Sequence, residues 1–159
     1  MRNPRSLFCS GLLMLVAVVP AWGETAAEAV EVEDPYVRAV PPGQSNSAAF
    51  MRLDNGSQQA HALVAVRSPA AQAVELHTHT MRDGMMSMRP LAQVELPAGE
   101  SVALQPGGLH VMLIGLQQQL ELDQEISLTL VFGDGSEREI SAPVRKIDVQ
   151  AMHHQHHQH

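Results

Sequence analysis

Clusters of turn-forming residues recur along this chain, and their spacing limits the folds that it can adopt. Six of them contain glycine and occupy residues 41–43, 54–56, 82–84, 97–99, 106–108 and 133–135. Glycine reaches the positive φ angles that tight turns need, and proline fixes φ at a value that suits a turn. The segments between the clusters are short and apolar, without a sustained 3.6-residue period flanked by caps. The pattern predicts an all-β protein, either a sandwich or a barrel.

The expected strands and their connections indicate antiparallel pairing. The segments expected to form strands are 36–40, 48–53, 61–67, 74–81, 85–89, 94–96, 102–104, 110–113, 126–132 and 137–144. Most connections are too short for the crossovers that parallel pairs need. Segment 85–89 should return beside 74–81 as the second strand of a hairpin, and residues 117–122 could hold one turn of helix.

Length and charge narrow the class of protein. The chain has 159 residues, 45% of them hydrophobic, which suits one domain with an aliphatic core. Its net charge is -7, and Lys and Arg form no visible cluster. Phosphate contacts need such clusters, so a nucleic-acid partner is not expected.

The first 23 residues have the three parts of a secretory signal peptide. Arg2 and Arg5 precede an apolar run over about 7–20, and Ala21 and Gly23 are small. The run is shorter than the roughly 20 residues of a spanning helix, so cleavage after Gly23 is favoured over a membrane anchor. We therefore expect a periplasmic protein with no stable membrane insertion after cleavage. The expected parts are a signal peptide over 1–23, a flexible lead-in over 24–35, a folded domain over 36–147 and a disordered tail over 148–159.

Two histidines and two methionines stand at distinctive distances in the expected sheet. His77 is followed after ten residues by Met88, after a further 21 by His110, and after one more by Met112. Residues i and i+2 of a strand share a face, so His110 and Met112 should point the same way. The hairpin can return Met88 beside His77. Neutral imidazole and thioether ligands favour Cu(I), and this set offers no carboxylate to Ca²⁺ or Mg²⁺. The spacing therefore predicts a copper(I) site.

Other histidines and methionines have different interpretations. Met51 shares a face with Leu53, so we expect it to fill the core. His61 is expected to be a surface or hydrogen-bonded residue. His79 shares the face of His77 and is a candidate accessory ligand. No role is assigned to Met81, Met85 and Met86, which could be further ligands, a docking lip or filling around the hairpin.

The single cysteine bears on the type of copper site. Cys9 lies before most of the apolar run, too early for the lipid-bearing cysteine that follows such a run, and it leaves with the signal peptide. The cleaved chain then has neither a thiol nor a disulfide. A blue-copper electron carrier needs a cysteine thiolate and is excluded.

The context of the four ligands resembles the periplasmic copper(I) chaperone family PCuAC. The shared features are H-x10-M-x21-H-x-M, V-E-L-H-T-H before it and P-G-G-L-H-V-M-L-I-G-L around its end, within a similarity from about Tyr36 to Arg145. The resemblance implies a cupredoxin-like, Greek-key antiparallel β-sandwich. It implies one Cu(I) bound near the surface by the residues that align with the family's ligands, which are His77, Met88, His110 and Met112. It also implies delivery of copper to the binuclear copper centre of a cytochrome c oxidase subunit, often alongside a Sco-like thioredoxin-fold protein.

The residues favour a carrier over an enzyme. The sequence shows neither a nucleophile arranged for turnover nor an H-E-x-x-H motif with its general base. Two alternatives stay open. One is a periplasmic copper buffer or detoxification protein without a dedicated client. The other is a small copper redox enzyme, which would need an open coordination position and a stable Cu(II) state at the main site.

The C-terminal residues form a second candidate site. The imidazoles and the thioether there suit Cu(II), Ni²⁺ or Zn²⁺, and some PCuAC members carry similar extensions. We hypothesise that this tail captures Cu(II) or a second copper ion. Its potential ligands are Met152, His153, His154, His156, His157 and His159.

Overall fold

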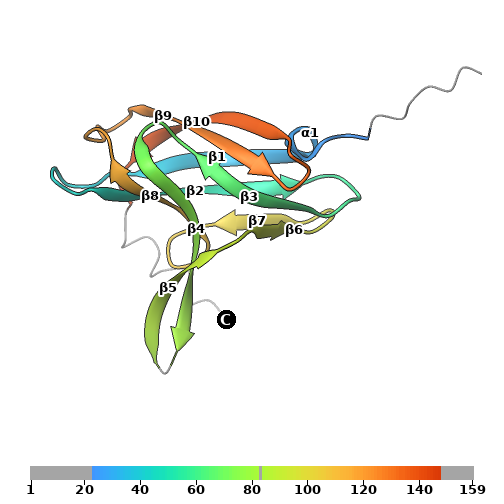
Figure 1. The fold of residues 1–159 in the computed structure, drawn as a ribbon, viewed down its shortest axis with the longest axis horizontal. Helices are drawn as coiled ribbons and strands as arrows, with labels where there is room; N and C mark the ends of the chain where they lie inside the picture. The colour runs from blue at the N-terminus through green and yellow to red at the C-terminus, as the bar shows by residue number, and fades with distance from the viewer. Residues whose placement is uncertain (1–22, 83, 148–159) are drawn as a thin grey trace, which may run out of the picture.

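The computed structural model describes residues 23–82 and 84–147, and these residues form an almost entirely β structure (Figure 1). One short helix precedes ten strands. The elements are α1 (Ala26–Ala29), β1 (Val30–Arg38), β2 (Asn46–Asn55), β3 (His61–Arg67), β4 (Ala71–Arg82), β5 (Met85–Leu91), β6 (Val94–Leu96), β7 (Ser101–Leu104), β8 (His110–Leu116), β9 (Glu125–Phe132) and β10 (Glu137–Arg145). A strand is found at each of the ten predicted segments, and most are longer than predicted by one to six residues at an end. The first ends at Arg38, two residues before its predicted end.

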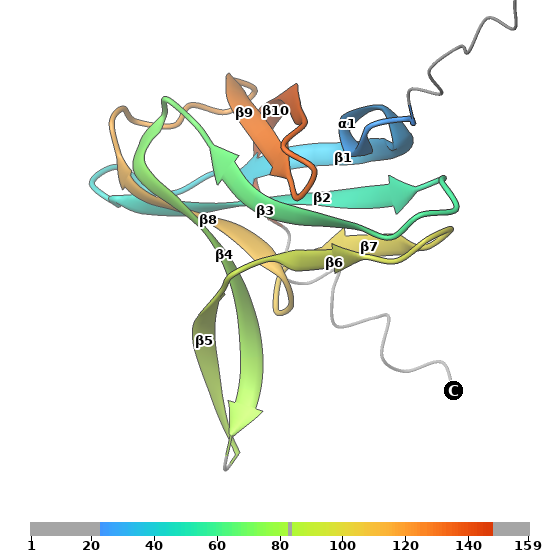
Figure 2. The ribbon, with the colours of Figure 1, turned by 45° about the vertical axis from the view of Figure 1, so that its right-hand side comes forward.

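The strands lie in two layers that pack face to face (Figures 1 and 2). The path of paired strands runs β5-β4-β8-β2-β1-β10-β9-β3-β6, and β7 pairs with β2 beside β8. The β1–β10 pair joins the two layers. This pair is parallel, with Val37 opposite Val144, and it departs from the antiparallel pairing that governs the other ladders. The two strands come from opposite ends of the domain, so short connections place no limit on their direction.

Alternation of side chains builds the core between the layers. In β9 the residues Ile126, Leu128, Leu130 and Phe132 are buried, and the residues between them are more exposed. A strand buried on one face has this two-residue period. Met51 is buried within the same core, as predicted.

The flexible lead-in predicted over 24–35 is wrong. Ala26 and Val30 are fully buried, and β1 begins at Val30. The backbone N–H of Ala26 donates to Oδ2 of Asp134 at 2.7 Å, and that of Ala27 donates to Oγ of Ser136 at 3.0 Å. The β9–β10 turn thus supplies acceptors for the first N–H groups of α1, which a helix cannot satisfy internally.

Residues 117–122 differ from the sequence prediction in having no helix. They form an irregular connection from β8 to β9 in which Leu120 is buried. A single turn of helix gains few hydrogen bonds for the dihedral angles that it fixes, and this loop instead packs Leu120 into the core.

The β4–β5 hairpin extends away from the two layers (Figures 1 and 2). Residues Leu76 to Arg82 of β4 pair with Met85 to Leu91 of β5. The first half of β4 pairs with β8 inside the sheet. One strand therefore carries side chains from the body of the protein out to the hairpin tip.

Candidate metal centre

The β4–β8 ladder brings two of the predicted ligands together. His77 lies directly opposite His110, and their ring centroids are 5.9 Å apart. Directly opposite residues of antiparallel strands place their side chains on the same face. Leu76 and Val111, paired one position earlier, are buried in the core on the opposite face. The strand parity expected from the sequence is thus found in the structure.

His110 presents a bare ring nitrogen in a buried position. Its Nδ1 lies 2.9 Å from the carbonyl oxygen of Gly108. A carbonyl only accepts, so Nδ1 carries the proton and Nε2 carries the lone pair. Nε2 is buried and has no hydrogen-bond partner among the described residues. A buried acceptor without a partner is costly, and a metal ion at this point would satisfy it.

The surroundings of His110 lower the pKa of its imidazole and so favour the neutral form. Burial is the largest cause that lowers the pKa of this imidazole, and the neighbouring His79 and His77 lower it further, while the Gly108 carbonyl opposes them. The neutral imidazole is the form that binds a metal. The surroundings of His110 therefore favour the ligand form of its ring.

His77 is oriented by a neighbouring carboxylate. Its Nε2 lies 2.7 Å from Oε2 of Glu75, two residues earlier on the same strand face. The carboxylate accepts, so this nitrogen donates and leaves Nδ1 as the lone-pair atom. Nδ1 is buried and has no partner in the part of the chain that the structure describes. A carboxylate that holds the far side of an imidazole is a common feature of histidine metal ligands.

His79 lies nearer to His110 than the sequence alone indicates. The two rings are stacked with centroids 5.0 Å apart, and Nδ1 of His79 is buried with no partner in residues 23–82 and 84–147. One nitrogen atom of each of three imidazoles in this small region therefore lacks a partner within the described structure. Contact of His79 with a metal stays a prediction, now with a geometric basis.

The two predicted thioethers flank these rings. Met112 lies opposite Glu75 in the β4–β8 ladder, and Met88 lies opposite His79 in the β4–β5 ladder. All four predicted ligands therefore share one face of the β5-β4-β8 sheet. Met112 is partly buried, and Met88 is 44% exposed. The site thus has a buried imidazole side and an open thioether side.

The donor set decides which metal fits. Among residues 23–82 and 84–147, no three His, Cys, Asp or Glu side chains are grouped to hold a metal ion. The thioethers of Met88 and Met112 share the face of His77 and His110, so they can complete the ligand set of a metal held by these two rings. Soft neutral ligands of this kind suit Cu(I).

Two features of the site were missed from sequence. The orienting role of Glu75 was available from the E-x-H spacing, which puts both residues on one strand face. The contact between His110 and the Gly108 carbonyl could not be predicted from sequence, because a backbone contact depends on the path of the loop. His61 contacts Ser57 Oγ at 3.2 Å, as expected for a hydrogen-bonded histidine outside the site.

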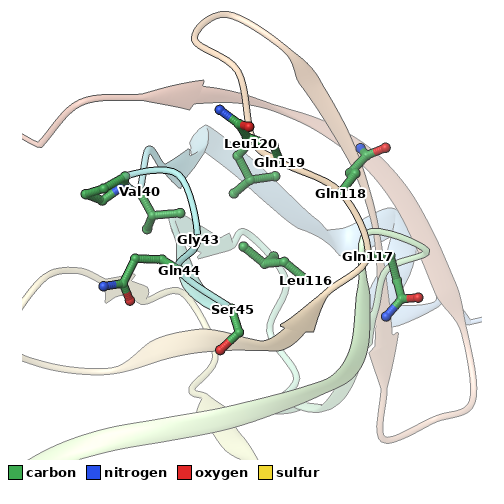
Figure 3. Close-up of a pocket in the computed structure, with 10 residues that line it drawn as sticks. Val40, Gly43, Gln44, Ser45, Leu116, Gln117, Gln118, Gln119 and Leu120 are labelled. Carbon is green, nitrogen blue, oxygen red and sulfur yellow. The ribbon is translucent and has the colours of Figure 1, made fainter.

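A separate depression lies at the far end of β8 (Figure 3). It has a volume of about 370 Å³ and is lined by the loop after β1 and the loop after β8. Gln44, Gln117, Gln118 and Gln119 line it together with apolar residues, and its described lining contains neither imidazole nor thioether. Six residues of extended strand, roughly 20 Å, separate Leu116 from His110. This depression does not belong to the candidate metal centre.

Comparisons with known proteins assign this chain to a family. Residues 30–144 match the family "LpqE-like: Putative lipoprotein LpqE-like". A relative from Leifsonia xyli subsp. xyli (strain CTCB07), named "Putative lipoprotein Lxx21020", is 34% identical over 139 residues, covering 85% of this chain and 82% of the relative. The chain therefore belongs to the LpqE-like family.

Solved structures place the fold among PCuAC domains. The copper-bound PCuAC domain from PmoF2 is 25% identical, with a TM-score of 0.66, covering 78% of this chain and 98% of that domain. Apo-DR1885 from Deinococcus radiodurans is 31% identical, with a TM-score of 0.60 and coverage of 92% and 97%. The Cu(I) form of DR1885 is 34% identical, with a TM-score of 0.58 and coverage of 80% and 87%. The resemblance to PCuAC proteins and their cupredoxin-like fold is confirmed.

Proposed function

We propose that this protein is an exported copper chaperone that binds one Cu(I) through His77, Met88, His110 and Met112 and delivers it to a cuproenzyme. The observation that carries the proposal is the His77–His110 pair. Each ring has one nitrogen held by a neighbouring acceptor and one buried nitrogen without a partner. Two thioethers share the face of the rings, and this soft set favours Cu(I).

The exposure of the site favours transfer over permanent storage. Met88 is 44% exposed, whereas His110 is 3% exposed. An acceptor's incoming ligand can replace an exposed thioether first, and the buried imidazoles can retain the ion until that exchange is complete. This asymmetry distinguishes a carrier from a closed structural metal site.

Export is part of the proposal. Residues 1–22 lie outside the described residues, so the predicted signal peptide, its cleavage after Gly23 and the periplasmic location remain predictions. A family described as lipoprotein-like is compatible with export. Within the described residues no helix is long and apolar enough to cross a membrane.

The client proposed for the copper is the binuclear copper centre of a cytochrome c oxidase subunit, with a Sco-like protein as a possible second partner. This choice follows from the PCuAC resemblance. Delivery predicts that the Cu(I)-loaded protein fills an apo acceptor domain faster than the same concentration of a small-molecule Cu(I) complex does. Equal rates would favour a copper buffer.

Binding itself is tested by Cu(I) competition against a chromophoric chelator, under anaerobic conditions. We expect His77→Ala to weaken affinity more than about 100-fold, since loss of a ligand should exceed the 10- to 100-fold effect of losing an outer contact. His61→Ala is the matched control, because His61 bonds to Ser57 away from the site. Equal affinities for the two variants would contradict the proposal.

The tail is a separate proposal. Residues 148–159 lie outside the described residues, and the idea that they bind Cu(II) stays a prediction. Removing the residues after Val149 should lower the number of Cu(II) ions bound and leave the first Cu(I) unchanged. Unchanged stoichiometry in both oxidation states would refute a role for the tail.

A further inference from the structure

Three methionines outside the core form a compact group on the hairpin. Met81 lies opposite Met86 in the β4–β5 ladder, and Met88 follows Met86 at i+2 on the same strand. The parity of both strands puts the three side chains on one face. It is the face of His77 and His79, so the group continues the proposed copper site outward.

The exposure of these methionines is unusual for apolar side chains. Met81 is 69% exposed, Met86 is 63% exposed and Met88 is 44% exposed. Large apolar groups gain free energy when they leave water, and a cluster of them on a protruding element requires an explanation beyond core packing. Exposure falls from the hairpin tip toward His77, which is partly buried, and His110, which is buried.

The geometry allows the three sulfur atoms to converge. Directly opposite residues have Cβ atoms roughly 4.5–5.5 Å apart, and diagonal neighbours lie roughly 7–8 Å apart, within reach of long side chains. Methionine has three rotatable side-chain bonds, so its sulfur can adjust to a shared ion. Thioethers do not titrate and select Cu(I).

We propose that Met81, Met86 and Met88 form an outer Cu(I) station built only of thioethers, which shares Met88 with the inner site. This inference rests on the proposed function and adds a route by which Cu(I) reaches the inner site. Cu(I) first exchanges its carrier ligands for the outer thioethers. Met88 then keeps its bond while His77 and His110 replace Met81 and Met86 one at a time, and Met112 adds as the fourth ligand. The ion remains Cu(I) throughout, and no electron is transferred.

Met85 provides an internal comparison. It pairs with Arg82 and points to the opposite face of the hairpin from Met86. It is 73% exposed, so it matches Met81 and Met86 in chemistry and solvent access. Only its face differs, which makes Met85 the control for non-specific binding of copper to exposed thioethers.

Methionine methyl NMR of the full chain tests the station. With ¹³C-methyl methionine and Cu(I) added anaerobically, the signals of Met88 and Met112 should shift with the first equivalent. With Met88 held by the first ion, further Cu(I) should bind the two remaining thioethers of the station and shift the signals of Met81 and Met86, while that of Met85 stays in place. Unmoved Met81 and Met86 signals, or a Met85 signal that shifts with them, would overturn the outer station.

The double variant Met81→Leu/Met86→Leu distinguishes an effect on the route of copper transfer from an effect on the affinity of the inner site. We expect its affinity for the first Cu(I) to change less than twofold and its rate of copper transfer to a chelator to fall at least fivefold. Met85→Leu should leave both unchanged. Equal transfer rates in the double variant and wild type would overturn the proposal, as would Met81 and Met86 signals that respond to an acceptor protein and not to Cu(I).

Failure of the proposed function gives a different result. If the inner site does not bind Cu(I), the Met112 signal does not shift at the first equivalent, whatever the hairpin signals do. If the inner site binds and the outer station does not exist, Met112 and Met88 shift and Met81 and Met86 stay unmoved. The same titration thus distinguishes the two failures.

Discussion

The two halves of β4 carry the same kinds of side chain in contrasting settings. Residues 71–77 pair with β8 within the sheet, and Leu76 there is 4% exposed. Residues beyond His77 pair only with β5, and Met81 there is 69% exposed. The first half is anchored in the core, and the second belongs to a two-stranded hairpin, which on its own is marginally stable.

Under the proposed function, the two halves would have separate tasks. The imidazoles would have to keep fixed positions, and the core and the acceptors Glu75 and Gly108 hold them. The exposed thioethers stand where solvent and a copper acceptor could reach them. Retention and release, both of which a carrier needs, would then lie along one face of β4.

The largest effect is expected when the core packing of the first half of β4 is weakened. Leu76→Ala should lower the free energy of unfolding by about 2–5 kcal/mol, because it leaves a cavity beside Val111 in the core. Chemical denaturation of the metal-free protein measures this. A cost below about 1 kcal/mol would mean that the first half of β4 is not anchored as described.

A smaller effect is expected when the contact that orients His77 is removed. Glu75→Ala removes the acceptor of its Nε2–H, and we expect Cu(I) affinity to fall about tenfold, at the lower end of the effect of such contacts because Glu75 is half exposed. Glu75→Gln retains an acceptor and should restore most of the affinity. Equal losses for both variants would show that charge, and not orientation, is what Glu75 supplies.

A substitution at Asp134 tests a region of the protein that is remote from both halves of β4. Asp134→Asn should reduce stability by about 0.5–1 kcal/mol, because the carboxylate caps the N–H of Ala26. That N–H and the Ser136 hydroxyl lower the pKa of Asp134. The contribution is therefore present above the ordinary aspartate pKa and is lost as pH falls through the lowered folded-state pKa. Urea melts should show the difference from wild type shrinking in acid, with Cu(I) affinity unchanged.

The smallest effect is expected at the hairpin tip. Met85→Ala should change the free energy of unfolding by less than about 0.5 kcal/mol, since the side chain is largely in water in the folded protein. The same denaturation assay used for Leu76→Ala checks this. A cost above 1 kcal/mol would show that the hairpin is packed in solution and would remove the contrast between the two halves.

Local sequence rules predicted most of this architecture. Turn clusters located the strands, and strand parity put His110 and Met112 on one face. Both depend on neighbouring residues, which the sequence displays directly. The ordered α1–β1 segment was missed because its small, acidic sequence carries a weak local signal. The contacts that order it are made with distant residues, namely β2 and Asp134, which lies 108 positions from Ala26.

The parts of the site that could not be predicted from sequence depend on the register between strands that are distant in the chain. That His77 faces His110 depends on how β4 slides along β8, and a shift of one residue would turn every side chain to the other face. The stacking of His79 on His110 has the same origin. The parallel β1–β10 pair also joins segments distant in the chain, so no local sequence pattern predicts it.

Cu(I) competition titration of Met88→Ala tests the central claim most directly, because Met88 joins the open hairpin to the buried rings. The account predicts a loss of affinity of at least about tenfold, with Met85→Leu as the exposed methionine that changes nothing. An affinity for Met88→Ala equal to that of wild type would contradict the assignment of Met88 as a ligand and with it the proposed His2Met2 site.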